Sequence, residues 1–202
     1  MRSTWRTLGP ATRRDIALLC LADGLVGLSF GALSAGAGLP WWFAPLSSVV
    51  VFAGASQFLL LGALTSGGVV AGVAAAVLVN LRLTPFALTV ADLLGPGFGR
   101  RLAGAHLVTD ETVAMALAQP DRTRRRATFW ACGLALFAAW NLGVAVGALT
   151  GAQIGDTRAL GLDAAFPAVL VALVMPALRD PGTRRAALLG AVVAVGASLV
   201  LP

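Results

Sequence analysis

The chain has 202 residues, of which 58% are hydrophobic and 12% are charged. A soluble globular domain usually carries about 25% charged residues, so this composition excludes an ordinary water-soluble domain and indicates a bilayer as the solvent. The formal net charge of +6 comes from 15 basic residues, all of them arginine. They lie at the ends of apolar runs, which favours a role in membrane topology over nucleic-acid binding.

The first apolar stretch, Ile16–Gly38, follows a basic N-terminal region. This order is also typical of a signal peptide, and Ala35-Gly36-Ala37 resembles a cleavage site. The stretch is longer than the roughly 7 to 15 apolar residues of a signal core, and more apolar segments follow it. We therefore expect it to be the first spanning helix.

The rest of the chain is a series of apolar segments, each close to the roughly 20 residues that a bilayer requires. The sequence predicts an all-α integral membrane protein with about seven transmembrane helices in a single domain, residues 1–202. The fourth segment is the weakest because it contains His106, Thr109, Asp110 and Glu111, and whether it spans fully stays open. The segments are Ile16–Gly38, Phe43–Leu64, Val69–Val90, Leu102–Ala118, Ala127–Leu149, Leu162–Leu178 and Ala186–Leu201.

The distribution of arginines predicts the orientation, because cytoplasmic loops are enriched in basic residues. With the N-terminus in the cytoplasm and every segment crossing, the basic N-terminal region and the clusters at 122–126 and 179–185 lie inside. Arg100, Arg101 and Arg158 then lie outside, and Arg82 lies within the third segment. This balance favours a cytoplasmic N-terminus and an outer C-terminus.

A weak internal repeat relates the first and fifth segments. Gly27–Ser34 and Gly143–Thr150 share the pattern G-x-x-x-G-A-L followed by a hydroxyl residue, and both segments would run in the same direction. Many transporters contain internal repeats. The alternative is that G-x-x-x-G recurs simply because membrane helices pack closely through small residues.

Polar residues inside apolar segments carry most of the functional information, because each one is costly to insert. The second segment contains Gly54, Ser56 and Gln57, which offer close backbone approach and hydrogen bonds to a substrate. The alternative is a small-residue helix contact in which Gln57 bonds across the bundle.

The third segment contains Asn80 and Arg82 shortly before Pro85. Pro85 cannot donate the hydrogen bond that the Leu81 carbonyl would accept, so we expect the helix to kink or unwind here. Such a site could hold a carboxylate on Arg82 and an ammonium group on free carbonyls. Alternatively, Arg82 pairs with a buried acid and serves only the structure.

Acidic residues and a histidine point to proton coupling. His106 and Asp110 share a helix face four residues apart, with Glu111 beside them and Asp23 in the first segment. They could form a proton relay or a charge partner for Arg82; at an interface they would merely be solvated. One histidine and two cysteines without metal-binding spacing predict no metal, no cofactor and no catalytic residue.

The order of these motifs resembles the AzlC family, the large subunits of bacterial branched-chain amino-acid exporters. The resemblance covers nearly the whole chain and is most specific around Phe52–Phe58. Gly161-Leu162-Asp163 also fits. The other matching stretches are Gly31-Ala32-Leu33, Ala35–Leu39, Asn80-Leu81-Arg82 and Thr109-Asp110-Glu111-Thr112.

The resemblance implies an inner-membrane permease that exports leucine, isoleucine and valine, with methionine as a further candidate, coupled to the proton-motive force. It also implies a small AzlD-like membrane subunit as partner. Family members often carry a histidine soon after the Asn-Leu-Arg motif, whereas Leu83-Thr84-Pro85 follows here. Two other classes stay open: a passive channel or importer for another small solute, and a non-transporting membrane scaffold.

Overall fold

The computed structural model describes residues 7–65, 68–151, 175 and 177–200. Its contacts divide the chain into a first unit, Met1–Leu162, and a second unit, Asp163–Pro202, and each is treated by itself. The prediction of a single domain over residues 1–202 stays a prediction. Most of the predicted sixth segment, Leu162–Leu178, lies outside the described residues, as does the Gly161-Leu162-Asp163 motif.

All regular elements in the described ranges are helices, which confirms the all-α class. The first unit contains α2 (Pro10–Gly36), α3 (Phe43–Val51), α4 (Gly54–Thr65), α5 (Val69–Leu81), α6 (Leu83–Thr89), α7 (Ala91–Leu94), α8 (Phe98–His106), α9 (Asp110–Leu117) and α10 (Arg122–Gly151). The second unit contains a 3₁₀ turn, η1 (Ala177–Arg179), and α12 (Pro181–Val200).

The helix α12 begins five residues before the predicted seventh segment because Asp180 caps it. The backbone N–H of Thr183 donates to Asp180 Oδ2 at 2.7 Å, which satisfies one of the unpaired donors of the first turn. This bond favours the ionised carboxylate, so the pKa of Asp180 lies below its usual value.

Within the described residues, three helical stretches are long and apolar enough to cross a membrane: α2, Gly72–Thr89 and α10. Gly72–Thr89 combines α5 and α6, which are interrupted only at Arg82. This interruption lies three residues before Pro85, near the position where a kink was predicted. Arg82 itself has helical backbone angles, φ −59° and ψ −24°, so the helix is interrupted locally and is not unwound there. These helices agree with the expectation of an integral membrane protein.

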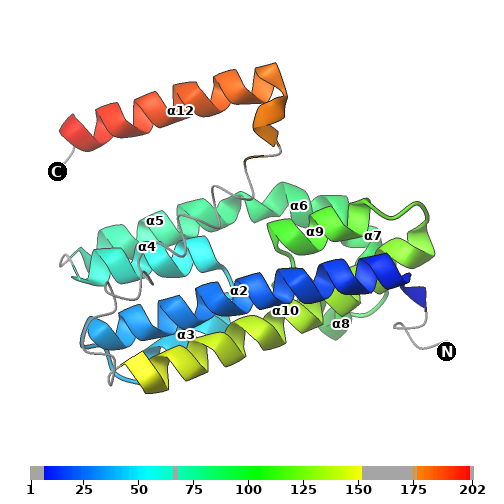
Figure 1. The fold of residues 1–202 in the computed structure, drawn as a ribbon, viewed down its shortest axis with the longest axis horizontal. Coiled ribbons are helices and arrows are strands. Elements are labelled where there is room, and N and C mark those ends of the chain that lie inside the picture. Colours follow the sequence, from blue (N-terminus) through cyan, green and yellow to red (C-terminus); the bar gives the residue numbers. More distant parts are fainter. Residues whose placement is uncertain (1–6, 66–67, 152–174, 176, 201–202) are drawn as a thin grey trace. The chain divides into compact units, whose positions relative to one another are not determined.

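The helices α2 and α10 pack side by side and run in the same direction (Figure 1). Glycines on each helix meet the backbone of the other, so no Cβ fits between them. A methyl group at Gly27 would lie 2.7 Å from the Trp140 carbonyl oxygen, and one at Gly143 would overlap the Gly24 carbonyl oxygen. The parallel direction expected for the two repeat motifs is confirmed.

The two G-x-x-x-G motifs pack against each other symmetrically. Gly31 faces the carbonyl of Val144, and Gly147 faces the carbonyl of Leu28. With the offset that aligns the two motifs, each of these contacts maps onto the other. The motifs therefore form a parallel helix pair with an approximate twofold relation, which supports both close packing and an internal repeat.

The helices α3 and α4 form a hairpin, called here the first hairpin. Gln57 Nε2 donates to Ser47 Oγ at 3.4 Å, although a continuous helix would place these residues about 15 Å apart. The chain reverses at Phe52, which has the left-handed φ of 43°. The arms of about 14 and 18 Å are shorter than the roughly 30 Å hydrocarbon core.

Contacts along α10 confirm this reversal. Ser48 of α3 bonds Asn141, and Phe52 packs against Phe137 one turn earlier, so α3 runs antiparallel to α10. The helix α4 then returns beside α5, to which it packs closely. The structure therefore replaces the single span expected over Phe43–Leu64 with a re-entrant hairpin.

The helices α8 and α9 form the second hairpin, which enters from the opposite end. Before α8, Asp92 pairs with Arg122 in the first turn of α10. After α9, the Gln119 carbonyl accepts a hydrogen bond from Arg125 at 2.8 Å. Both ends of the second hairpin thus lie beside the start of α10, and the predicted fourth segment, Leu102–Ala118, does not cross.

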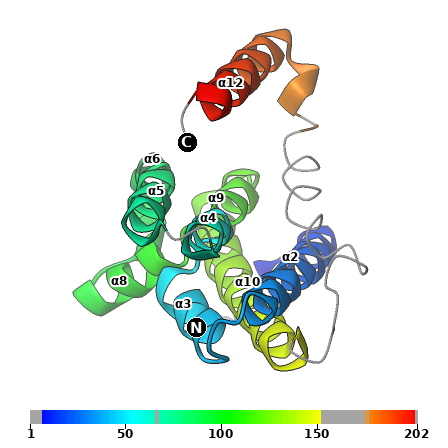
Figure 2. The same ribbon diagram turned by 90° about the vertical axis from the view of Figure 1, so that its left-hand side faces the viewer.

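With two hairpins, the arginines of the first unit are distributed between its two ends differently from the sequence-based prediction. Among its described residues, every arginine except Arg82 lies at the end where α2 and α10 begin, which we call the arginine-rich end. Arg100 and Arg101, which the sequence placed on the opposite side from the 122–126 cluster, belong to the same end, since Arg100 lies over the ring of Trp130 in α10. Figure 2 shows the unit from its other end.

Candidate functional site

The tips of the two hairpins meet near the middle of α10. His106, the last residue of α8, places Nε2 2.9 Å from the Val49 carbonyl oxygen in the last turn of α3. Because a carbonyl only accepts, this ring nitrogen is the one that carries a proton. The rings of Phe52, His106 and Phe137 pack together with centroids 5.0–6.0 Å apart, so aromatic side chains close the centre of the bundle.

The first hairpin is tied to α10 by a buried polar network around Gln57. The Trp140 Nε1–H donates to Gln57 Oε1 at 3.2 Å, and Gln57 Nε2 donates to Ser47. At the next residue of each helix, Ser48 Oγ donates to Asn141 Oδ1 at 2.8 Å. Gln57 therefore forms hydrogen bonds between helices. This contact is the one predicted by the alternative interpretation, in which Gln57 bonds across the bundle.

Gly54 begins α4 directly against the indole of Trp140. A methyl group here would lie 3.0 Å from the Trp140 ring. The absence of a side chain at this residue therefore lets the hairpin tip pack against α10. Trp140 and Asn141 lie just before the second glycine motif, Gly143–Thr150, and this position is their only signal in the sequence.

Ser56 and Asn80 lie together between α4 and α5. Ser56 is 1% exposed, and its hydroxyl is 2.9 Å from Asn80 Oδ1 and 3.0 Å from the Ala76 carbonyl oxygen. The sequence grouped these residues as hydrogen-bonding candidates, and the structure brings them into contact.

Arg82 forms an ion pair with Asp110. The distance from Arg82 Nη2 to Asp110 Oδ2 is 2.9 Å, and the two side chains are 50% and 36% exposed. Asp110 Oδ1 is buried without a hydrogen-bond partner among the described residues. Arg82 stands at the break between two helices and Asp110 at the start of α9, so the pair joins two irregular positions within the apolar region.

The start of α9 is fixed by Thr109 and Thr112. The Thr112 N–H donates to Thr109 Oγ1 at 3.2 Å and the Thr109 N–H donates to Thr112 Oγ1 at 2.8 Å, a reciprocal cap. Asp110 and Glu111 follow in the first turn, where the helix dipole favours negative charge. This cap holds Asp110 in position for Arg82.

Asp23 and Glu111 are the remaining acids within the apolar region of the first unit. Asp23 of α2 interacts electrostatically with Glu111 of α9. Neither has a basic side chain within 4.0 Å among the described residues. The structure thus separates the predicted acids into one paired residue, Asp110, and two carboxylates without a basic partner.

The four candidate proton-coupling residues do not form a single chain of contacts. His106 bonds Val49, and Asp110 bonds Arg82, so the expected pairing of His106 with Asp110 on one helix face is absent because α8 ends at His106 and α9 begins at Asp110. In the described part of the chain, no group of three or more His, Cys, Asp and Glu side chains could hold a metal ion.

Comparison with known proteins identifies the family. The AzlC protein family matches residues 19–154. The chain belongs to the AzlC family, a branched-chain amino-acid transport family. The match runs from the middle of α2 to beyond the end of α10 and includes both hairpins and the Arg82–Asp110 pair. Because AzlC proteins are transport proteins, this assignment also supports the expectation that the chain is not an enzyme.

Two Helicobacter pylori proteins, each described as an uncharacterized membrane protein, are similar over most of their length. The protein of strain ATCC 700392 / 26695 is 29% identical and that of strain J99 / ATCC 700824 is 30% identical, each over 175 residues that cover 85% of this chain and 76% of the relative. No solved structure matches the chain.

Proposed function

We propose that this AzlC-family chain is the large subunit of a two-component transporter that exports branched-chain amino acids across the bacterial inner membrane. The observation that carries the proposal is the Arg82–Asp110 pair, which joins the junction of α5 and α6 to the start of α9 within the apolar region. Charged residues and interrupted helices at membrane depth are typical of substrate and ion pathways.

An amino-acid zwitterion carries the same two charges as this ion pair. Arg82 can bind the substrate carboxylate through paired N–H donors, while Asp110 can accept the ammonium group. Both side chains are partly exposed, and Asp110 Oδ1 still lacks a donor. The substrate can therefore insert by exchanging one ion pair for two, without leaving either protein charge unpaired.

The hairpin tips provide a barrier that would have to open during transport. The His106–Val49 bond and the ring cluster of Phe52, His106 and Phe137 join the two hairpins. Because the two hairpins enter from opposite ends, separation of their tips would open the centre of the bundle. Branched aliphatic side chains suit a passage closed by aromatic rings.

Glu111 and Asp23 are our candidates for proton coupling, because Asp110 is engaged by Arg82. Acidic side chains inside membrane segments are typical of proton relays. We place the arginine-rich end in the cytoplasm by the positive-inside rule. The small AzlD-like subunit is the expected partner within the bilayer.

Leucine efflux from preloaded vesicles tests the proposal. The chain is reconstituted alone and with its small subunit, with and without a proton gradient. We expect gradient-dependent efflux only with both subunits, and loss of efflux in Glu111→Gln if Glu111 carries the proton. Efflux at the same rate with and without the proton gradient would indicate a passive channel. A well-inserted complex that transports no leucine would refute the branched-chain assignment.

A further inference from the structure

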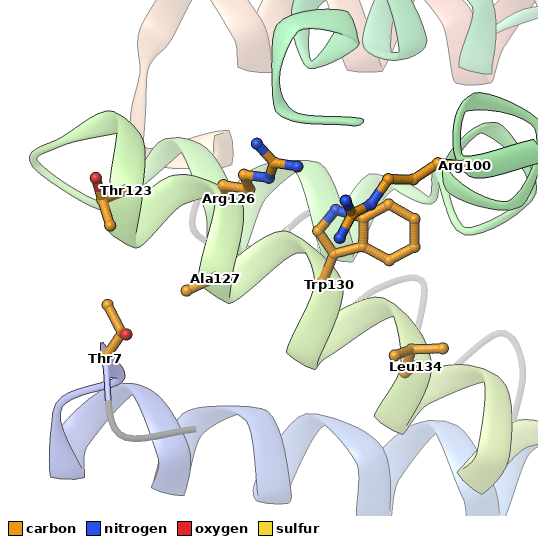
Figure 3. A pocket seen from close by; sticks show the side chains of 7 residues that line it. All are labelled: Thr7, Arg100, Thr123, Arg126, Ala127, Trp130 and Leu134. Carbon is orange, nitrogen blue, oxygen red and sulfur yellow. The ribbon is translucent and has the colours of Figure 1, made fainter. Parts of the chain in front are cut away.

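A cavity of about 340 Å³ lies at the arginine-rich end of the first unit, away from the Arg82–Asp110 pair. Its lining comes from the N-terminal segment, the start of α8 and the first turns of α10. Figure 3 shows Arg100 lying across the indole of Trp130, with Arg126 one turn earlier on α10. The site already described uses none of these residues.

The two arginines that line this cavity lack acidic partners. Arg122 and Arg124, in the same part of α10, pair with Asp92 and Asp121. By contrast, no carboxylate in the described ranges lies within 4.0 Å of Arg100 or Arg126. The cavity therefore carries two positive charges that no carboxylate in the described part of the chain neutralises.

A third donor in the lining is also unsatisfied. The indole N–H of Trp130 is buried and has no hydrogen-bond acceptor in the described part of the chain, although a buried donor normally finds one. Thr7 and Thr123 add hydroxyl groups, and Leu134, which is 56% exposed, adds an apolar surface. The lining thus offers donors and positive charge but no negatively charged acceptor.

The backbone around Gly95 allows the two arginines to converge. Gly95 has a φ of +91°, a conformation that favours glycine. A methyl group there would overlap Arg126 Nη2 and would lie 3.3 Å from Arg100 Cδ. The link between α7 and α8 is therefore shaped so that both side chains lie beside it.

We propose that this cavity binds a phosphate group, and that its source is the phosphodiester head group of an anionic phospholipid. Guanidinium groups bind phosphate oxygens through paired N–H donors, and an oxygen could also accept the Trp130 N–H. The apolar Leu134 next to charged residues suits a lipid, whose head group and acyl chains differ in the same way. Basic pockets between transmembrane helices are a recognised form of such a site.

Lipid binding by the delipidated, purified full chain tests the proposal, with phosphatidylglycerol as the probe and phosphatidylcholine as the zwitterionic reference. Native mass spectrometry counts bound lipid, and the unfolding midpoint reports its stabilising effect. We expect preferential binding of phosphatidylglycerol, weakened about fivefold by Arg126→Gln and by Arg100→Gln. Trp130→Phe, which keeps the ring and removes the N–H, should also weaken it.

Arg124→Gln is the matched control, because it removes the same charge from the same part of α10 at a residue that has its own acidic partner. It should leave lipid binding unchanged. The proposed site would be wrong if Arg124→Gln and Arg126→Gln weakened phosphatidylglycerol binding equally, or if no variant weakened it. Inorganic phosphate forms the second arm: if it stabilises the chain as well as phosphatidylglycerol does, with the same dependence on Arg126, the source is soluble phosphate and the lipid assignment is wrong.

Discussion

Gln57 shows what a single polar side chain does in an apolar bundle. Its amide oxygen accepts from Trp140 and its amide nitrogen donates to Ser47, so both ends are satisfied while the side chain is 1% exposed. These bonds connect α10, α4 and α3. The residue stabilises the hairpin tip beside which a substrate would pass.

We predict that Gln57→Leu and Trp140→Phe are coupled in their effect on stability. Gln57→Leu alone leaves the indole N–H of Trp140 without an acceptor, and the double variant removes both groups. Cross-helix hydrogen bonds in membranes contribute about 0.6 kcal/mol on average and up to about 1.7 kcal/mol. A double-mutant cycle from reversible unfolding in micelles should give a coupling in this range, and strict additivity would contradict the bond.

The Arg82–Asp110 pair yields a prediction that separates structure from transport. Arg82→Asp combined with Asp110→Arg retains the two opposite charges but reverses them, so folding and insertion should return toward the wild-type level. A zwitterion that binds through both residues would meet its charges in exchanged places, at a different distance from the hairpin tips. We expect each single variant, and the exchanged pair, to lack leucine efflux.

The control for this exchange is the pair Arg124→Asp with Asp121→Arg, a surface ion pair at the arginine-rich end. Both its single variants and its exchange should transport normally, since exposed pairs contribute little to stability. Recovery of full efflux in the Arg82–Asp110 exchange would assign that pair a purely structural role.

For individual residues, the sequence indicated which polar side chains form contacts inside the bundle and predicted some of those contacts. Arg82 meets Asp110, and Ser56 meets Asn80, because a polar group inside apolar segments has few partners to choose from. The contacts of Ser47, Ser48 and Asn141 were not predicted. Their residue types are common in membrane helices, and only the reversal of the chain brings them together.

The re-entrant hairpins could not be predicted at the level of the element. Apolar composition predicts burial in lipid or protein but not chain direction, so Phe43–Leu64 looked like one span. The reversal rests on the left-handed backbone of Phe52, a residue that rarely adopts it. In the second hairpin, Thr109 and Thr112 form the cap at the start of α9. The same two threonines also fit inside a continuous helix, so the sequence alone does not indicate that a helix begins there.

The parallel pairing of α2 and α10 makes a prediction about glycine. A methyl group at Gly31 would overlap the Val144 carbonyl oxygen, and backbone cannot move aside as a side-chain end can. We expect Gly31→Ala to destabilise the chain by about 1–3 kcal/mol, the usual cost of overpacking, and to lower the amount of folded protein in the membrane. Thermal unfolding in detergent measures the effect.

Gly190→Ala is the matched control, because it makes the same change in α12 at a position where no atom of the described residues lies within 4 Å of the added group. It should be neutral or stabilising by up to about 1 kcal/mol, since alanine favours helix. If both variants unfold like the wild type, the close approach of α2 and α10 is not required for the fold.

At the largest scale, the described arginines of the first unit agree with the direction of its long helices, because all of them except Arg82 lie at the arginine-rich end. Two expected crossings become hairpins in the first unit, so α5–α6 runs opposite to the predicted third span, while α10 keeps its predicted direction. The charge argument does not distinguish seven crossings from two hairpins, because when neither segment 43–64 nor segment 102–118 crosses, the 122–126 cluster returns to the same side. The revised arrangement also places Arg100 and Arg101 at the arginine-rich end.

Side-specific labelling distinguishes the two topologies. In a background with Cys20→Ala and Cys132→Ala, single cysteines are placed by Gly99→Cys at the start of α8, Thr123→Cys at the start of α10 and Pro40→Cys after α2. A membrane-impermeant thiol reagent is applied to right-side-out and inside-out vesicles. With two re-entrant hairpins, positions 99 and 123 are labelled from the same side, which the positive-inside rule makes the cytoplasm, and position 40 from the other. With seven crossings, position 99 is labelled together with position 40, because the chain would cross once more between residues 99 and 123. The side on which position 99 reacts therefore decides whether His106 and Val49 meet at the tips of two hairpins or lie in two helices that each cross the bilayer.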